Sequence, residues 1–124
     1  MKSFVVIPTY DEADTIEELI RSLLSMGMDV EVLIVDDHSP DGTAEVVRKM
    51  KEKEPRVHLI ERPKKMGLGS AYLEGFRVAL EKGAEAIFEM DGDLSHDPKY
   101  IPNMLERLRE ADLVIGSRYL RGVS

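Results

Sequence analysis

Residues 30–43 read VEVLIVDDHSPDGT, a stretch in which an apolar run passes through two aspartates into a turn. The run over 30–35 is rich in β-branched residues, which predicts a buried strand. The cluster Ser39-Pro40-Asp41-Gly42 is typical of a turn, and we expect Thr43 to cap a helix that continues to about Lys53. A strand, a turn and a helix in this order form the repeating unit of a parallel sheet with helical crossovers.

The rest of the chain repeats this alternation of short apolar runs and stretches of helical period. We expect the other strands at residues 4–7, 57–60, 86–90 and 113–115, and the other helices at about 13–26, 69–80 and 98–108. The pattern predicts one α/β domain over residues 1–124, with a mainly parallel sheet and helices on both faces.

The composition narrows the possible functions. The 124 residues carry 24 acidic and 17 basic side chains, and the formal net charge of −7 argues against a general nucleic-acid binder. The absence of cysteine excludes a disulfide scaffold, a Cys-ligated zinc site and a cysteine nucleophile. No apolar run approaches the ~20 residues that a membrane-spanning helix needs.

Open parallel sheets bind their ligands beyond the carboxyl ends of the strands, so the residues after each predicted strand carry the functional prediction. Most of these segments are acidic, and two contain an arginine. They are Pro8–Glu12, Asp36–Ser39, Glu61-Arg62, Asp91–Asp93 and Gly116–Tyr119.

Asp91-Gly92-Asp93 is the strongest chemical feature of the sequence. Two carboxylates on either side of a glycine, directly after a buried strand, offer the hard oxygen ligands that Mg²⁺ and Mn²⁺ prefer. The alternative is an ordinary turn, since aspartate and glycine are common in loops. The position after a strand favours a metal site that also receives phosphate.

Asp36 and Asp37 leave two interpretations open. An acidic residue after the second strand of a nucleotide-binding sheet can accept a hydrogen bond from a ribose hydroxyl or a base N–H. Alternatively, the adjacent charges only solvate a loop, with Asp37 or Ser39 organising the turn.

The loop after the first predicted strand argues against a dinucleotide fold, which would need glycines there. This loop instead offers the aromatic ring of Tyr10, which could stack on a base, and Glu12, which could accept from a ribose or an amide. The alternatives are a partly buried tyrosine and a carboxylate that favours the first turn of a helix.

The segment Gly67-Leu68-Gly69-Ser70-Ala71 follows Lys64-Lys65 and leads into the third predicted helix. A glycine turn before a helix N-terminus can bind an anion. Small residues at these positions can equally serve close packing of the helix on the sheet.

Four segments together resemble the nucleotide-binding half of family 2 glycosyltransferases, which have the Rossmann-like GT-A fold. Within that group the chain is most similar to dolichol-phosphate (polyprenol-phosphate) mannosyltransferases. The similarity covers essentially the whole chain. The matching segments are Ile7–Glu12, Val35–Thr43, Met90–Pro98 and Ile115–Tyr119.

The resemblance implies a role for each matching residue. It implies that Pro8, Tyr10, Glu12, Val35 and Asp37 form the guanosine pocket of a nucleotide-sugar site.

The resemblance further implies that Asp91 and Asp93, with Gly92 between them, meet the diphosphate through Mg²⁺ or Mn²⁺. Arg118 would face the donor or acceptor phosphates, so that Asp93 and Arg118 are the expected catalytic residues. Two positions depart from the family pattern: Gly92 stands where alanine is common, and Ser95 stands where some relatives have glutamine.

The implied reaction is metal-dependent mannosyl transfer from GDP-mannose to a polyprenyl (dolichyl) phosphate, with inversion. Family members continue beyond the arginine segment, so we interpret the chain as an N-terminal, donor-binding portion. We expect this portion to bind nucleotide and to self-associate, but not to transfer sugar by itself. The whole enzyme would work in the cytoplasm, at the cytoplasmic face of a membrane. The alternatives are a related transferase that uses UDP-glucose or another acceptor, and a catalytically silent nucleotide-binding module.

Overall fold

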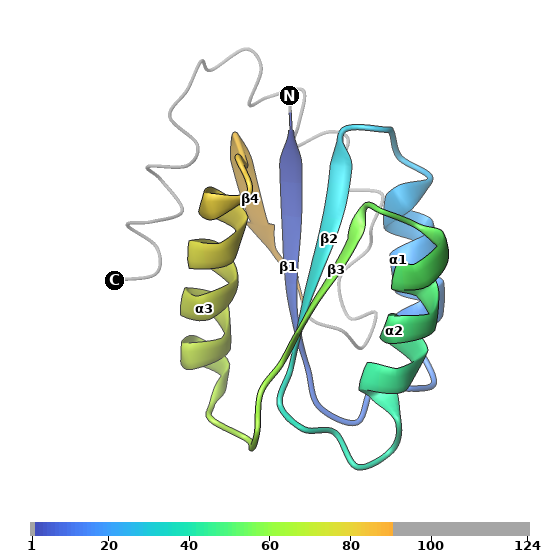
Figure 1. Cartoon of the computed structure of the whole chain (residues 1–124), viewed down its shortest axis with the longest axis vertical. Coiled ribbons are helices and arrows are strands. Elements are labelled where there is room, and N and C mark those ends of the chain that lie inside the picture. The colour runs from blue at the N-terminus through green and yellow to red at the C-terminus, as the bar shows by residue number, and fades with distance from the viewer. Residues whose placement is uncertain (1, 91–124) are drawn as a thin grey trace.

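The computed structural model describes residues 2–90, which form a parallel sheet and three helices (Figure 1). The predicted elements at 98–108 and 113–115 lie outside the described residues. The strands are β1 (Ser3–Thr9), β2 (Val30–Asp36), β3 (Val57–Glu61) and β4 (Ala86–Glu89). The helices are α1 (Ile16–Leu24), α2 (Thr43–Lys53) and α3 (Leu68–Glu81).

The strands are ordered β3-β2-β1-β4 and every neighbouring pair is parallel, which confirms the predicted fold class. The register places Thr9 beside Asp36, and Asp36 beside Glu61, so β1, β2 and β3 end at the same edge. The strand order reverses between β1 and β4, because β2 and β3 follow on one side of β1 and β4 is added on the other. In such sheets this reversal marks the usual ligand crevice.

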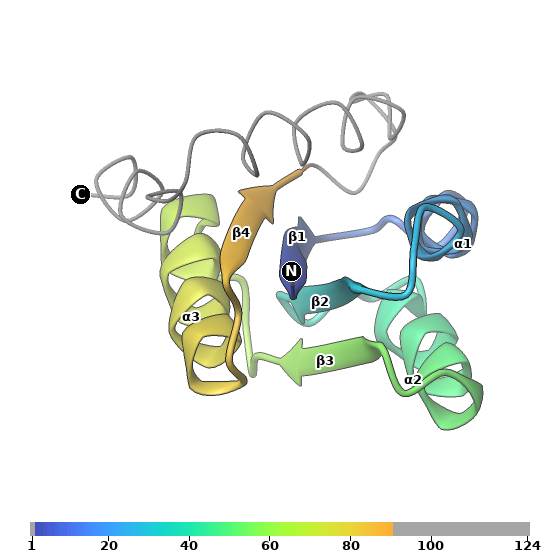
Figure 2. The same ribbon diagram turned by 90° about the horizontal axis from the view of Figure 1, so that it is seen from above.

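Helices cover both faces of the sheet (Figure 2): α1 and α2 lie on one face and α3 lies on the other. Alternate residues of β1 supply the two cores, since Val5 and Ile7 pack toward α1 and α2 whereas Phe4 and Val6 pack toward α3. None of the helices described between residues 2 and 90 has the length and apolar character needed to cross a membrane.

Close packing of α3 depends on Gly75. A Cβ atom added there would lie 2.4 Å from Cγ1 of Val6 and 3.2 Å from Cγ2 of Val35, both on buried strands. Of the small residues considered for packing in segment 67–71, Ala71 is buried against the sheet, whereas a Cβ at Gly67 or Gly69 would meet nothing within 4 Å.

Two helix starts differ from the prediction. The first helix begins at Ile16 rather than near residue 13, because residues 13–15 form a turn in which the backbone N–H groups of Thr15 and Ile16 both donate to the carbonyl of Glu12. The prediction that Thr43 caps α2 was wrong: Gly42, at φ 91°, is the capping residue and Thr43 is the first residue of the helix.

Candidate functional site

The carboxyl edge of the sheet, at the bottom of Figure 1, carries the loops that follow β1, β2 and β3. It brings together the predicted residues Pro8, Tyr10, Glu12, Val35 and Asp37. The other predicted site residues, Asp91, Gly92, Asp93 and Arg118, lie outside the described residues.

Asp37 and Arg62 form a buried ion pair at this edge. The two residues keep only 6% and 3% of their surface exposed. Nε of Arg62 donates to Oδ1 of Asp37 at 2.7 Å, and Nη2 donates to Oδ2 at 3.2 Å. The backbone N–H of Met66 adds a third bond to Oδ2 at 3.1 Å. This geometry is the two-pronged arrangement in which a guanidinium binds a carboxylate most strongly.

The pair shifts the pKa of both partners. Burial by itself would raise the pKa of Asp37, but the hydrogen bonds from Arg62 and the Met66 backbone outweigh burial and lower it below its ordinary value. The hydrogen bond to Asp37 raises the pKa of Arg62. Asp37 is therefore ionised at neutral pH and acts only as an acceptor.

Arg62 also fastens the loop between β3 and α3. Its Nη2 donates to the carbonyl of Gly67 at 3.1 Å, and its Nη1 donates to Oγ of Ser70 at 2.8 Å and to Glu74 at 3.4 Å. Sequence reasoning noted the cation after the third strand but gave it no role. The available signal was a basic residue directly after a strand, at an edge where the other strand ends are acidic.

Asp36 organises the turn after β2. Its carboxylate accepts from Oγ1 of Thr9 at 2.7 Å, from the backbone N–H of Ser39 at 2.9 Å and from Oγ of Ser39 at 2.6 Å. Ser39 Oγ in turn accepts from the backbone N–H of Asp11 at 2.9 Å, which ties the first two loops together. The interpretation that both aspartates merely solvate a loop was wrong, because Asp36 and Asp37 are buried and hydrogen-bonded.

Tyr10 presents an aromatic ring on the first loop. It keeps 38% of its surface exposed, and Nζ of Lys65 lies 4.4 Å from the centre of its ring. A cation at this distance from an exposed ring contributes about 0.5–1 kcal/mol. The next residue, Asp11, has φ 59°, so the chain turns sharply after the ring.

The other predicted pocket residues surround this loop. Pro8 and Val35 are buried and lie opposite each other on β1 and β2. Glu12 is half-buried, and its backbone N–H donates to Oγ1 of Thr43 at 3.0 Å. An exposed ring beside ionised and neutral acceptors can hold a flat, polar ligand such as a nucleobase.

The fourth strand runs toward the same edge, because the backbone N–H of Met90 donates to the carbonyl of Val6 at 3.1 Å. Asp91 follows Met90 directly in the sequence. Between residues 2 and 90, no group of three or more His, Cys, Asp or Glu side chains could hold a metal ion. The carboxylates of Asp91 and Asp93 are the hard oxygen donors that suit Mg²⁺ or Mn²⁺, so the donor chemistry fits the predicted ion.

Comparison with known families identifies the family of this chain. Residues 4–124 match the family described as Glycosyl transferase family 2. The chain belongs to this family. Its parallel sheet with helices on both faces matches the GT-A fold of solved glycosyltransferases, as the sequence predicted.

Curated relatives match nearly the whole sequence, and each of the three matches below covers 98% of this chain. The undecaprenyl-phosphate mannosyltransferase of Micrococcus luteus is 43% identical, and the match covers 50% of that protein. The polyprenol monophosphomannose synthase of Mycolicibacterium smegmatis and the dolichol-phosphate mannosyltransferase of Pyrococcus furiosus are each 40% identical, with 46% and 34% of their lengths covered. The chain thus spans half the length or less of these relatives.

Solved structures of glycosyltransferases share the fold. The mannosyltransferase PcManGT from Pyrobaculum calidifontis, in complex with GDP-Man and Mn²⁺, has a TM-score of 0.58 and 29% identity, over 74% of this chain and 27% of that one. S. aureus TarS 1–349 has a TM-score of 0.72 and 25% identity, over 89% and 33% of the two chains. Its complex with UDP has a TM-score of 0.64 and 28% identity, over 75% and 28%.

Proposed function

We propose that the chain is the donor-binding part of an inverting, metal-dependent transferase that moves mannose from GDP-mannose to a polyprenyl phosphate. The observation that carries the proposal is the carboxyl edge that the strands share. The exposed ring of Tyr10 follows β1, which is next to β4, and the ionised Asp37 follows β2, which is two strands from β4. Asp91 comes shortly after β4 in the sequence. The names of the similar proteins, polyprenol- and dolichol-phosphate mannosyltransferases among them, support the same reaction.

The strand order suggests how the donor lies along this edge. The nucleoside would sit over the ends of β1 and β2, on Pro8, Tyr10, Glu12, Val35 and Asp37. The diphosphate would point toward the end of β4. In this orientation the ring of Tyr10 and the carboxylate of Asp37 would contact the nucleoside of the nucleotide sugar. The metal ligands would contact its diphosphate.

Asp37 is well suited to recognise the base. Its carboxylate accepts from Arg62 and from the backbone N–H groups of Met66 and Gly67, which fix its position at the edge of the sheet. Because its pKa is lowered, the carboxylate stays an acceptor for a ring N–H of guanine at any pH near neutrality. Arg62 would hold that acceptor in place.

The metal ligands would be Asp91 and Asp93, with Gly92 allowing close approach of the phosphates. A bound Mg²⁺ or Mn²⁺ would supply positive charge against the charge that develops on the leaving diphosphate. Arg118 would face the donor or acceptor phosphates and add a fixed positive charge there. An attacking phosphate oxygen is already anionic near neutral pH, so the transfer requires no strong general base from this chain.

The lipid nature of a polyprenyl phosphate would place the whole enzyme at a membrane surface. We propose the cytoplasmic face. The reaction is tested by incubating full-length protein with labelled GDP-mannose and dolichyl phosphate and measuring labelled mannolipid. The same assay tests the alternative of a catalytically silent module, which predicts nucleotide binding without product.

The donor-binding proposal is tested by titrating the chain with GDP in the presence of Mg²⁺ or Mn²⁺, and again with EDTA. We expect GDP to bind only weakly without the cation, because Asp91 and Asp93 would face the diphosphate as bare like charges. Asp93→Ala should remove the metal dependence and leave the fold intact. Equal affinity with and without the cation would contradict the metal assignment.

The similarity to a TarS structure in complex with UDP favours a second candidate, a transferase with a UDP-sugar donor. Titration with UDP beside GDP separates the two. A clear preference for UDP would replace GDP-mannose as the donor and leave the location of the site unchanged.

A further inference from the structure

Lys65 lies over the ring on which the base is proposed to stack. Its Nζ is 4.4 Å from the centre of the Tyr10 ring, although the two residues belong to different loops at the carboxyl edge. Lys65 and its neighbour Lys64 are both exposed. In the part of the chain from residue 2 to residue 90, neither lysine forms an ion pair with a carboxylate.

The loop that carries Lys65 is fixed on both sides of it. The backbone N–H of Arg62 donates to the carbonyl of Asp36 at 2.8 Å, and the backbone N–H of Met66 donates to Asp37 at 3.1 Å. The short segment between these two bonds has little freedom to move away. The backbone of the loop therefore fixes the position of Lys65 beside Tyr10, and only the rotamer of its side chain determines where the ammonium lies.

The strand order places this ammonium at the base end of the proposed donor site. Lys65 follows β3, which lies at the opposite side of the sheet from β4, and β4 leads to the proposed metal ligands. Asp37, which anchors this loop through the backbone N–H of Met66, is already paired with Arg62. The charge of Lys65 is thus available for an acceptor on the base, because its ammonium rests on the ring of Tyr10, where the base is proposed to stack.

We propose that Lys65 reads the base of the donor nucleotide: when guanine stacks on Tyr10, the ammonium leaves the ring and donates to O6 and N7 of guanine. This inference rests on the proposed function. Guanine presents two adjacent acceptors, O6 and N7, to which lysine and arginine commonly bind, whereas the corresponding edge of a pyrimidine offers one carbonyl and no N7. Lys65 would therefore favour a guanine nucleotide over a uracil nucleotide.

The test is calorimetry in Mg²⁺ buffer with wild type, Lys65→Met and the matched control Lys64→Met, using GDP and 7-deaza-GDP, which lacks N7. We expect Lys65→Met to weaken GDP about tenfold, as for the loss of a lysine contact to guanine, and Lys64→Met to weaken it less than about twofold. The wild type should bind 7-deaza-GDP several-fold more weakly than GDP, and Lys65→Met should bind the two about equally. Circular dichroism confirms that both exposed-site variants fold.

The remaining outcomes each decide the question. Equal losses for the two variants would show a general charge effect and overturn the inference. Unchanged or tighter GDP binding by Lys65→Met would show that the lysine only covers the ring, and the inference would fall while the proposed function stands. A penalty for 7-deaza-GDP that is the same in wild type and Lys65→Met would place the contact away from the base. Failure of the wild type to bind GDP would instead overturn the proposed function, and this inference with it.

Discussion

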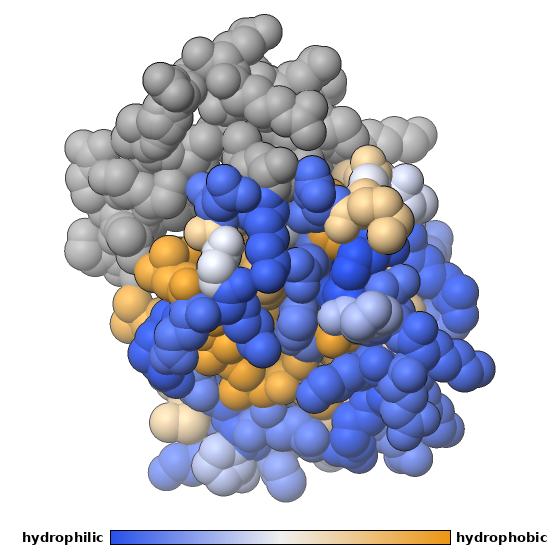
Figure 3. Space-filling view, turned by 45° about the horizontal axis from the view of Figure 1, so that its top comes forward, coloured by the Kyte–Doolittle hydropathy of each residue, from blue (hydrophilic) through white to orange (hydrophobic). Residues whose placement is uncertain are grey.

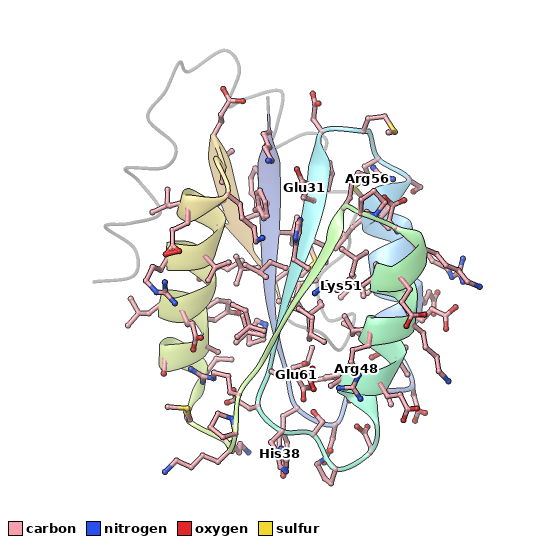
Figure 4. All side chains as sticks on the ribbon, in the orientation of Figure 1. Glu31, His38, Arg48, Lys51, Arg56 and Glu61 are labelled. Carbon is pink, nitrogen blue, oxygen red and sulfur yellow. The ribbon has the colours of Figure 1, made fainter. Side chains whose placement is uncertain are left out.

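At the carboxyl ends of the strands Asp37 and Arg62 are buried, whereas at the amino ends the pair formed by Glu31 and His58 keeps 16% and 19% of its side-chain surface exposed. Figure 4 shows Glu31 and Arg56 near one edge of the sheet, with His38 and Glu61 near the other. Seen toward the amino end, the surface is largely hydrophilic, with apolar side chains visible between the charged ones (Figure 3).

The two edges use charge for different purposes. A buried ion pair gains little net stability, because the cost of removing both charges from water offsets their attraction. Arg62 nevertheless connects the end of β2 to the following loop and to Ser70 on α3. The buried network therefore positions loops around the proposed donor site, whereas the partly exposed pairs at the amino edge hold the starts of strands and the end of α1.

The largest expected effect is that of Arg62→Ala. Removing one partner of a buried pair leaves an uncompensated charge, so the free energy of unfolding should fall by about 3–5 kcal/mol. Urea denaturation measures it. Arg48→Ala is the matched control, because Arg48 pairs with Glu61 with about half of each side chain exposed, and it should change stability little.

A double variant sharpens this prediction. Asp37→Leu combined with Arg62→Met removes both charges and should recover much of the stability that Arg62→Ala loses. GDP binding should be lost in this double variant, because Asp37 is the proposed acceptor for the base. If Arg62→Ala proved no more destabilising than Arg48→Ala, burial of the Asp37–Arg62 pair would make no difference to its contribution, because both pairs lie at the carboxyl edge.

Asp37→Asn should cost somewhat less, about 1.5–3 kcal/mol at pH 7, which is the range for a hydrogen bond to a charged group. The pKa of Asp37 is lowered in the fold, so its contribution is complete above the pKa of an unfolded aspartate, about 3.9, and is lost as the pH falls through the lower folded value. The stability difference between wild type and variant should therefore be constant from pH 8 to pH 5 and shrink below about pH 4. A difference that disappeared between pH 5 and pH 8 would contradict this assignment.

Tyr10→Ala should affect binding and leave stability nearly unchanged. A base stacked on an aromatic side chain is worth about 1–3 kcal/mol, so GDP and GMP should weaken by about the same factor. Tyr10→Phe keeps the ring and should retain most of the affinity. If Tyr10→Ala unfolded the chain, the ring would be a core side chain, as the alternative interpretation of the sequence held.

The sequence predicted the strands well, because their apolar runs follow local periodicity. The run over residues 4–7 and the run over 57–60 each lie within an observed strand. It also predicted that Tyr10 and Asp37 would meet at one edge, since parallel strands end together. These inferences need only short stretches of sequence and the topology of parallel sheets.

The pairing of Asp37 with Arg62 was beyond sequence reasoning. The two residues are 25 positions apart, and which acidic residue an arginine selects depends on loop geometry that no local pattern encodes. The same holds for Gly75, whose missing Cβ matters only because Val6 packs against it. The sequence identified Asp36 and Asp37 as a pair of acids but could not show that they bind different loops.

The smallest expected effect is that of Glu31→Gln at the amino edge. Oε1 of Glu31 lies 2.7 Å from Nε2 of His58, and Oε2 lies 3.4 Å from Nζ of Lys2. Glutamine keeps a carbonyl acceptor and loses only the charge, in a setting that water partly screens, so stability should fall by about 1 kcal/mol or less. GDP affinity should stay within about twofold of wild type, because this edge is the opposite end of the sheet from the proposed site. Urea denaturation and calorimetry on the same preparation measure both quantities. A loss of GDP affinity comparable to that of Tyr10→Ala would mean that the two edges are energetically coupled, and the division of roles between them would then be wrong.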